Sequence, residues 1–216
     1  MSRRRTQRRA QAMATKQNEA EAVARRLGKA IVSAVALLLA CSEPSLPVEK
    51  ASIEELRSRA EAGEVDAQTE LGDRYSLGEG VVDDDAEAVR WYRQAADRGY
   101  APAQVDIGLM YDIGAGVEQD WAEALGWYKR AAKQRYPMGL AFLGQMHRDG
   151  KGVPKDGIEA YKWFSLATTY RVDVIRPAGS DIYRRDRELV SGRLTPNQLA
   201  EAQRRAREFI EAHPPE

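Results

Sequence analysis

A period of 36 residues constrains the fold of this 216-residue chain more than any other feature of its sequence. When the sequence is offset by 36, three successive units place glycines, tryptophans and alanines at the same positions. The matched sets include Gly72, Gly108 and Gly144, then Gly78, Gly114 and Gly150, and Trp91, Trp127 and Trp163. Repetition at a period of about 20 to 50 residues is typical of repeat proteins, in which each unit packs on its neighbours.

The residue pattern of each unit predicts a pair of helices. In the first unit, residues 66–76 place Ala67, Leu71 and Tyr75 four positions apart, which gives one apolar stripe. Gly72 has no side chain, so a partner helix can approach closely there, which would explain a residue that costs about 1 kcal/mol in a helix. The glycines that follow are expected to end the helix, because glycine readily adopts the left-handed conformation.

The second helix of each unit is predicted to start at an aspartate that is followed three positions later by a glutamate. The pairs are Asp84 and Glu87, Asp120 and Glu123, and Asp156 and Glu159. An aspartate at the N-cap accepts hydrogen bonds from free amides of the first turn, and the glutamate can reach back to the cap residue's amide. The pattern predicts a variant of the capping box in all three units.

The period also sets the predicted organisation of the chain. It is lost after Tyr170, where a loop is expected at 177–180, then a helix at about 181–191 and a last helix that opens at Thr195. The predicted segments are a signal peptide at 1–40, a tether at 41–51, a capping half-repeat at 52–65, repeats at 66–101, 102–137 and 138–170, and a helical cap at 171–216.

The N-terminal region predicts export. Residues 1–29 are rich in arginine and lysine, and an apolar run follows at 30–40. A helix of about 11 residues spans about 16 Å, whereas a bilayer core needs about 20 residues. The run is therefore too short for a stable membrane span and is typical of the apolar region of a secretory signal.

The end of this run, Leu38-Leu39-Ala40-Cys41, resembles the lipobox of bacterial lipoproteins. The resemblance implies cleavage before Cys41 and acylation of its thiol, so that lipid on Cys41 would hold the chain at the membrane. Ser42 is not the aspartate of the inner-membrane retention signal, which favours the outer membrane, facing the periplasm. Two alternatives stay open: cleavage elsewhere with an incidental Cys41, or an uncleaved inner-membrane anchor.

Charge and composition argue against several classes of partner. Residues 1–40 hold 9 of the 33 Lys and Arg and 2 of the 33 Asp and Glu, so the remainder carries a formal charge of −7. A body this acidic is a poor candidate for nucleic-acid binding. One cysteine and two histidines supply no constellation for a cysteine- or histidine-based metal site. We expect no metal, no cofactor and no nucleic-acid partner.

The repeat resembles the Sel-1-like repeat family, whose units are helical hairpins related to tetratricopeptide repeats. The middle unit carries the pattern most fully, with Ala103, Ile107-Gly108, Met110-Tyr111, Gly114-Ala-Gly-Val117, Asp120, Ala124-Leu125, Trp127-Tyr128 and Ala131-Ala132. The resemblance implies an all-α, right-handed solenoid that serves as an adaptor or scaffold, with no shared catalytic residues. The chain departs from the pattern at Arg135, where Gly99 stands one unit earlier, and at His147, which replaces a tyrosine.

Candidate binding positions are those at which the first helices of the units differ. They are Glu70, Asp106 and Phe142, then Asp73, Leu109 and Gln145, then Ser76, Asp112 and Arg148. Leu109 and Phe142 are apolar where a solvated face would be polar. Either they pack between neighbouring units, or they are exposed together and form a binding patch with an acidic rim.

The function predicted from the sequence is a protein–protein interaction scaffold, anchored by lipid in the bacterial envelope and binding an unknown protein or peptide. The alternative is a cell-wall or β-lactam hydrolase. It is disfavoured because the chain has no Ser-x-x-Lys, Gly-x-Ser-x-Gly or His-Glu-x-x-His motif. A structural or stress-response envelope protein is a third possibility.

Overall fold

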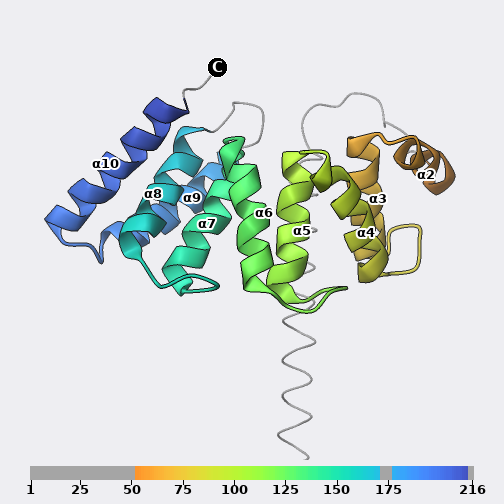
Figure 1. Cartoon of the computed structure of the whole chain (residues 1–216), viewed down its shortest axis with the longest axis horizontal. Helices are drawn as coiled ribbons and strands as arrows, with labels where there is room; N and C mark the ends of the chain where they lie inside the picture. The colour runs from red at the N-terminus through yellow and green to blue at the C-terminus, as the bar shows by residue number, and fades with distance from the viewer. Residues whose placement is uncertain (1–51, 171–176, 214–216) are drawn as a thin grey trace, which may run out of the picture.

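The computed structural model describes residues 52–170 and 177–213, in which it has nine α-helices and no strand. From α2 to α8 the helices follow one another across the molecule, and α9 and α10 complete the far end (Figure 1). The helices are α2 (Ile53–Glu61), α3 (Val65–Leu77), α4 (Asp85–Asp97), α5 (Ala101–Ile113), α6 (Trp121–Lys133), α7 (Pro137–Asp149), α8 (Gly157–Thr169), α9 (Pro177–Ser191) and α10 (Pro196–Ala212).

Six helices of 13 residues each form three hairpins, α3–α4, α5–α6 and α7–α8, as the period predicts. The hairpins are joined through their second helices, because α4 packs on α5 and α6 packs on α7. Helix α2 packs on α3, as a preceding half-repeat would. The prediction of an all-α solenoid is confirmed.

The glycine inside each first helix faces a large ring from the second helix. The pairs are Gly72 and Tyr92, Gly108 and Tyr128, and Gly144 and Phe164. A Cβ atom on any of the three glycines would lie 2.6 to 2.8 Å from a ring carbon. All three rings are 0% exposed, so they form the centre of each hairpin. The close approach expected from the sequence is confirmed.

The second helices begin at the predicted aspartate N-caps: Asp84 for α4, Asp120 for α6 and Asp156 for α8. Their carboxylates accept hydrogen bonds from first-turn amides at 2.8 to 3.1 Å. The return bond expected from the glutamates is absent in these three helices, so that part of the prediction is wrong. The amides of the three cap residues donate instead to the carbonyls of Tyr75, Tyr111 and His147 at 2.9 to 3.0 Å, so they are not available to the glutamates.

The link between consecutive hairpins requires a residue in the left-handed conformation. Gly63 and Gly99 meet this need with φ of +91° and +89°, and Arg135 occupies the third equivalent position with φ of +61°. A side chain in this region costs about 1 to 2 kcal/mol. The substitution at Arg135 therefore places strain at the link before α7, while its guanidinium lies 6.0 Å from the ring centre of Tyr170.

A Gly99→Ala variant is expected to measure this backbone strain alone. No atom lies within 4 Å of the position that a Cβ atom would take, so steric overlap does not contribute. We expect the free energy of unfolding to fall by about 1 kcal/mol. Urea denaturation followed by helical circular dichroism checks this, and an unchanged midpoint would contradict it.

Helices α9 and α10 both pack on α8 and close the end of the array. The expected loop at 177–180 is wrong, because α9 begins at Pro177. Proline is tolerated in the first turn, where a backbone amide has no partner within the helix. Helix α10 has the predicted capping box: Thr195 Oγ1 accepts from the Gln198 amide at 3.3 Å, and Gln198 Oε1 accepts from the Thr195 amide at 3.0 Å.

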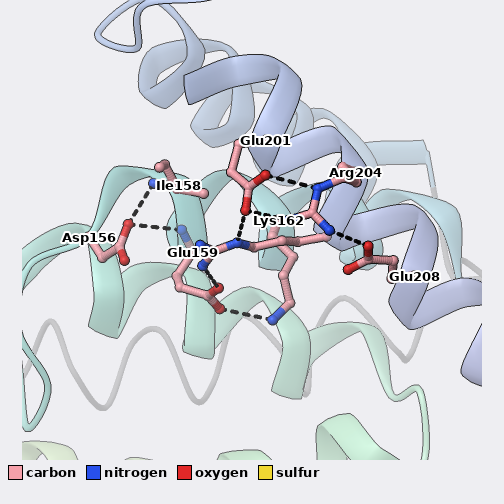
Figure 2. A network of polar contacts seen from close by, with 8 residues as sticks. Asp156, Ile158, Glu159, Lys162, Glu201, Arg204 and Glu208 are labelled. Carbon is pink, nitrogen blue, oxygen red and sulfur yellow. Dashed lines mark hydrogen bonds and ion pairs between the residues drawn. The ribbon is translucent and has the colours of Figure 1, made fainter. Parts of the chain in front are cut away.

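An ion-pair network holds α10 against α8 (Figure 2). Arg205 donates to Glu159 of α8 at 2.8 Å and to Glu201 of its own helix at 2.7 Å, while Arg204 also donates to Glu201. Burial raises the pKa of Glu159, but hydrogen bonds from Lys162 and Arg205 outweigh it and hold the pKa below its usual value. The last helix is therefore fixed by charge as well as by apolar contact.

The predicted signal peptide at 1–40, the tether at 41–51 and Cys41 lie outside the described residues. None of the helices in the described residues has the length and apolar composition of a membrane span.

Candidate functional site

The nine predicted binding positions fall on α3, α5 and α7 and differ widely in exposure. Glu70 is exposed, and the half-buried positions are Asp73, Asp106, Phe142, Gln145 and Arg148. The buried positions are Ser76 at 2%, Leu109 at 9% and Asp112 at 9% exposure. The structure thus brings a mixed set of charged, polar and apolar side chains to one set of helices.

The two apolar positions are packed within the solenoid. Leu109 is buried, and the ring of Phe142 stacks on Tyr128 with a centroid distance of 4.7 Å and an angle of 7°. This arrangement agrees with the packing alternative for Leu109 and Phe142, and the two side chains do not form an exposed patch together.

The third set of predicted binding positions, Ser76, Asp112 and Arg148, makes contacts within the protein. Asp112 pairs with Lys151 at 2.9 Å. Arg148 pairs with Asp186 at 3.0 Å and so ties α7 to α9. Ser76 Oγ lies 3.5 Å from a carboxylate oxygen of Asp85. These side chains are engaged in holding neighbouring elements together.

Two carboxyl groups on adjacent first helices form an acidic pair, Asp73 on α3 and Asp106 on α5. Burial raises the pKa of Asp73 to about 6, against a hydrogen bond from the Tyr92 hydroxyl at 2.7 Å that lowers it. Burial also raises the pKa of Asp106 well above its usual value, and the charge of Asp73 raises it further. The pair therefore retains a proton at a pH where ordinary aspartates are ionised.

Sequence reasoning missed that Tyr92 is the partner of Asp73. In the second unit Tyr128 occupies the equivalent position, but Leu109 stands where Asp73 stands, and the Tyr128 hydroxyl is buried without a hydrogen-bond partner. In the third unit a phenylalanine, Phe164, removes the hydroxyl. The signal was available in the sequence, because both positions of each pair recur with the period of 36.

Removing the hydroxyls of Tyr92 and Tyr128 is expected to have different effects on the free energy of unfolding. Tyr92→Phe leaves Asp73 without its donor and should lower the free energy of unfolding by about 1 kcal/mol. Tyr128→Phe removes an unsatisfied buried group and should leave the free energy unchanged or raise it by about 1 kcal/mol. Urea denaturation of the two variants side by side checks this, and equal losses would show that Tyr128 has a partner in solution.

A second repeated contact links each first helix to the preceding second helix. The pairs are Arg57 with Tyr75, at 2.6 Å, and Arg93 with Tyr111. The third unit has His147 in the tyrosine's place, and burial lowers the pKa of His147. Half-burial and this shift agree with a packing role for His147. Across the described ranges, no group of three or more His, Cys, Asp and Glu could hold a metal ion.

The fold and these positions define a helical-repeat protein in which equivalent residues build the core and differing residues lie on the first helices. The model of the Sel1 repeat matches residues 65–100, 101–136 and 137–169. The chain belongs to the Sel1 repeat family.

Two solved structures are similar to this chain. A Sel1 repeat protein from Oxalobacter formigenes is 35% identical, with 63% of this chain and 96% of that chain covered and a TM-score of 0.53. A protective antigen of uropathogenic Escherichia coli strains, with an SLR fold, is 26% identical and has a TM-score of 0.68. That match covers 90% of this chain but 39% of the antigen. No curated protein matches the chain.

Proposed function

We propose that this protein is a non-catalytic scaffold, anchored by lipid on Cys41 in the bacterial envelope and facing the periplasm, that binds a protein or peptide through α3, α5 and α7. Sel1 repeat proteins are in general protein-interaction scaffolds. The observation that carries the proposal for this chain is the acidic pair of Asp73 and Asp106. Burial raises the pKa of both carboxyl groups, and carboxyl groups with strongly raised pKa values are frequent at functional positions.

The proposal of a lipid anchor rests on the order of three features in the sequence. A basic segment at 1–29 precedes a short apolar run at 30–40, and the lipobox-like residues end at Cys41. Mass spectrometry of the mature N-terminus from membrane fractions tests the anchor. A chain that begins at acylated Cys41 supports it, whereas a soluble chain with an intact N-terminus contradicts it.

The scaffold itself is tested by photocrosslinking in intact cells. A photoreactive residue at Glu70, exposed on α3, is expected to yield a discrete adduct with another protein. The matched control is Gln94, which is exposed on the second helix α4 and should yield none. No adduct at Glu70, or the same adducts at both positions, would contradict binding through the first helices.

The hydrolase alternative receives no support from the described residues, because no observation there favours it over a scaffold. The absence of the three hydrolase motifs in the sequence remains the argument against it.

A further inference from the structure

Helix α9 is the first helix of a unit that the chain does not complete. In the complete units, α5 packs between α4 and α6, and α7 packs between α6 and α8. Helix α9 packs on α8 in the same way, but the next helix, α10, also packs on α8 and does not cover α9. Among the described helices, α9 therefore lacks the second helix that covers each earlier first helix.

The uncovered side of α9 exposes two large apolar side chains. Tyr183 and Val190 pack towards the core, and Val190 is 4% exposed. Ile182 and Leu189 are instead 55% and 54% exposed. They stand seven positions apart, so they lie on one side of the helix, about 10 Å from each other along its axis. Exposed apolar side chains on an uncovered helix are typical of an interaction surface.

The same side of α9 carries a positive charge that no described side chain neutralises. Arg185 stands between the two apolar residues, is exposed, and pairs with none of the described side chains. The neighbouring acid, Glu188, lies 4.0 Å from Arg184. Ile182, Arg185 and Leu189 together form the α9 face. An occupant that fits this face has a negative charge and room for two bulky apolar side chains.

Helix α2 offers this combination at the other end of the array. It is a second helix without a first helix of its own, and its main neighbour among the described helices is α3. Its exposed side carries Glu54 and Glu61, which stand seven positions apart and pair with none of the described side chains. Ser58 and Ala62 are exposed on the same side and are small, so they leave room for bulky apolar side chains beside the acids.

We propose that the α9 face of one copy binds α2 of a second copy, which completes a helix pair between the two molecules. The two helices lie towards opposite ends of the array, so α2 does not meet α9 within one copy (Figure 1). Arg185 would meet the two glutamates, while the apolar side chains of the α9 face pack over the small residues of α2. The inference is separate from partner binding through α3, α5 and α7 and does not rest on it.

The contact is expected to be weak and to join copies head to tail. It is heterologous, because one copy contributes α9 and the other contributes α2. Two short helices bury less surface than the roughly 1,200 Å² that a stable protein–protein interface needs. We therefore expect self-association with a dissociation constant on the order of 100 µM.

Sedimentation velocity of the full chain in excess neutral detergent, at concentrations on either side of about 100 µM, tests the association. Arg185→Glu should weaken it roughly tenfold, and so should Glu54→Arg combined with Glu61→Arg, because each change places like charges across the contact. The matched control is Arg207→Glu, which reverses an exposed charge on α10 and should change association less than about twofold. No association of the unaltered chain, or equal weakening by the control, would overturn the proposal.

A mixture of the two charge-reversed proteins gives a sharper readout. In an equimolar mixture, the reversed α9 face of one protein meets the reversed α2 of the other, and the two unaltered surfaces also meet. Association should therefore return to within about twofold of the unaltered chain. A mixture that stays monomeric, although both variants keep the helical circular dichroism of the unaltered chain, would overturn the proposal.

The apolar part of the contact is tested by Leu189→Ala. The side chain is 54% exposed, so its removal should leave the urea midpoint unchanged and weaken self-association roughly fivefold. Unchanged association would show that the apolar side chains of the α9 face are not buried between copies, and would contradict the proposal.

Photocrosslinking shows which surfaces meet. A photoreactive residue at Ser58 of α2, mixed with a heavy-isotope-labelled copy, is expected to join light and heavy chains in an adduct that digestion maps to α9. The matched position is Ala200, which is exposed on α10 and should give no such adduct. An adduct from Ser58 that stays within one chain, or that maps to a helix other than α9, would contradict docking of α2 on α9.

Discussion

Replacing Gly108 by alanine is expected to lower the free energy of unfolding by about 2 kcal/mol. The new Cβ atom would lie 2.6 Å from a carbon of the Tyr128 ring, well inside ordinary contact distance. The ring cannot move away easily, because it is fully buried and stacks on Phe142. The strain therefore exceeds the gain of about 1 kcal/mol that alanine normally gives over glycine inside a helix.

Gly126 provides the matched control for this substitution. It lies inside α6, is exposed, and has no atom within 4 Å of the position of a Cβ atom. Gly126→Ala should therefore raise the free energy of unfolding by about 1 kcal/mol, as expected for an unhindered helical site. Urea denaturation of both variants should give a difference of about 3 kcal/mol, and two stabilised variants would show that α5 and α6 are not in close contact.

The features that could be predicted from the sequence are those that recur with the period. The glycine inside each first helix and the aspartate before each second helix stand at constant spacing, and each acts through a contact within its own hairpin. Such contacts follow from helix geometry and cap chemistry alone. For this reason the hairpins, their N-caps and the close approach of Gly108 to its partner helix agree with the structure.

Apart from the missing return bonds of the glutamates, whose cap amides donate within their own hairpins, the features that were mispredicted or left open depend on what lies outside one hairpin. The start of α9 at Pro177 falls where the period is lost, and proline followed by small residues resembles a loop as much as a first turn. The periodicity of α5 does not show which of its residues meet the neighbouring hairpin, so the burial of Leu109 could not be distinguished from exposure. The pairing of Asp73 with Asp106 depends in the same way on the register between α3 and α5.

The acidic pair is expected to make the fold less stable as the pH rises. The folded-state pKa of Asp73 is about 6, above the usual value of 3.8. Below about pH 4, Asp73 is protonated in both the folded and the unfolded chain, and its contribution to stability is fully present. Between about pH 4 and 6 the unfolded chain ionises first, so this contribution is lost as the pH rises through the folded-state pKa.

Asparagine at position 73 reproduces the protonated carboxyl group at every pH and still accepts the hydrogen bond from Tyr92. Asp73→Asn should therefore match the unaltered chain near pH 4 and exceed its free energy of unfolding by roughly 2 kcal/mol at pH 7, after allowance for the water that reaches Asp73. The charged groups Glu70, Glu79 and Arg74 also act on Asp73 and are the same in both proteins. Asp106 loses the charge of Asp73 in the variant, so the difference reports the effect of Asp73 on itself and on Asp106 together.

Urea denaturation at a series of pH values from 4 to 7 measures this difference, with Asp97→Asn as the control for removal of one exposed charge. The control should show a gap near zero that does not change with pH, because an exposed aspartate has nearly the same environment in both states. A pH-independent gap for Asp73→Asn would mean that the carboxyl group is not buried beside another. A gap that grows with pH would show that the ionised carboxyl group of Asp73 destabilises the fold.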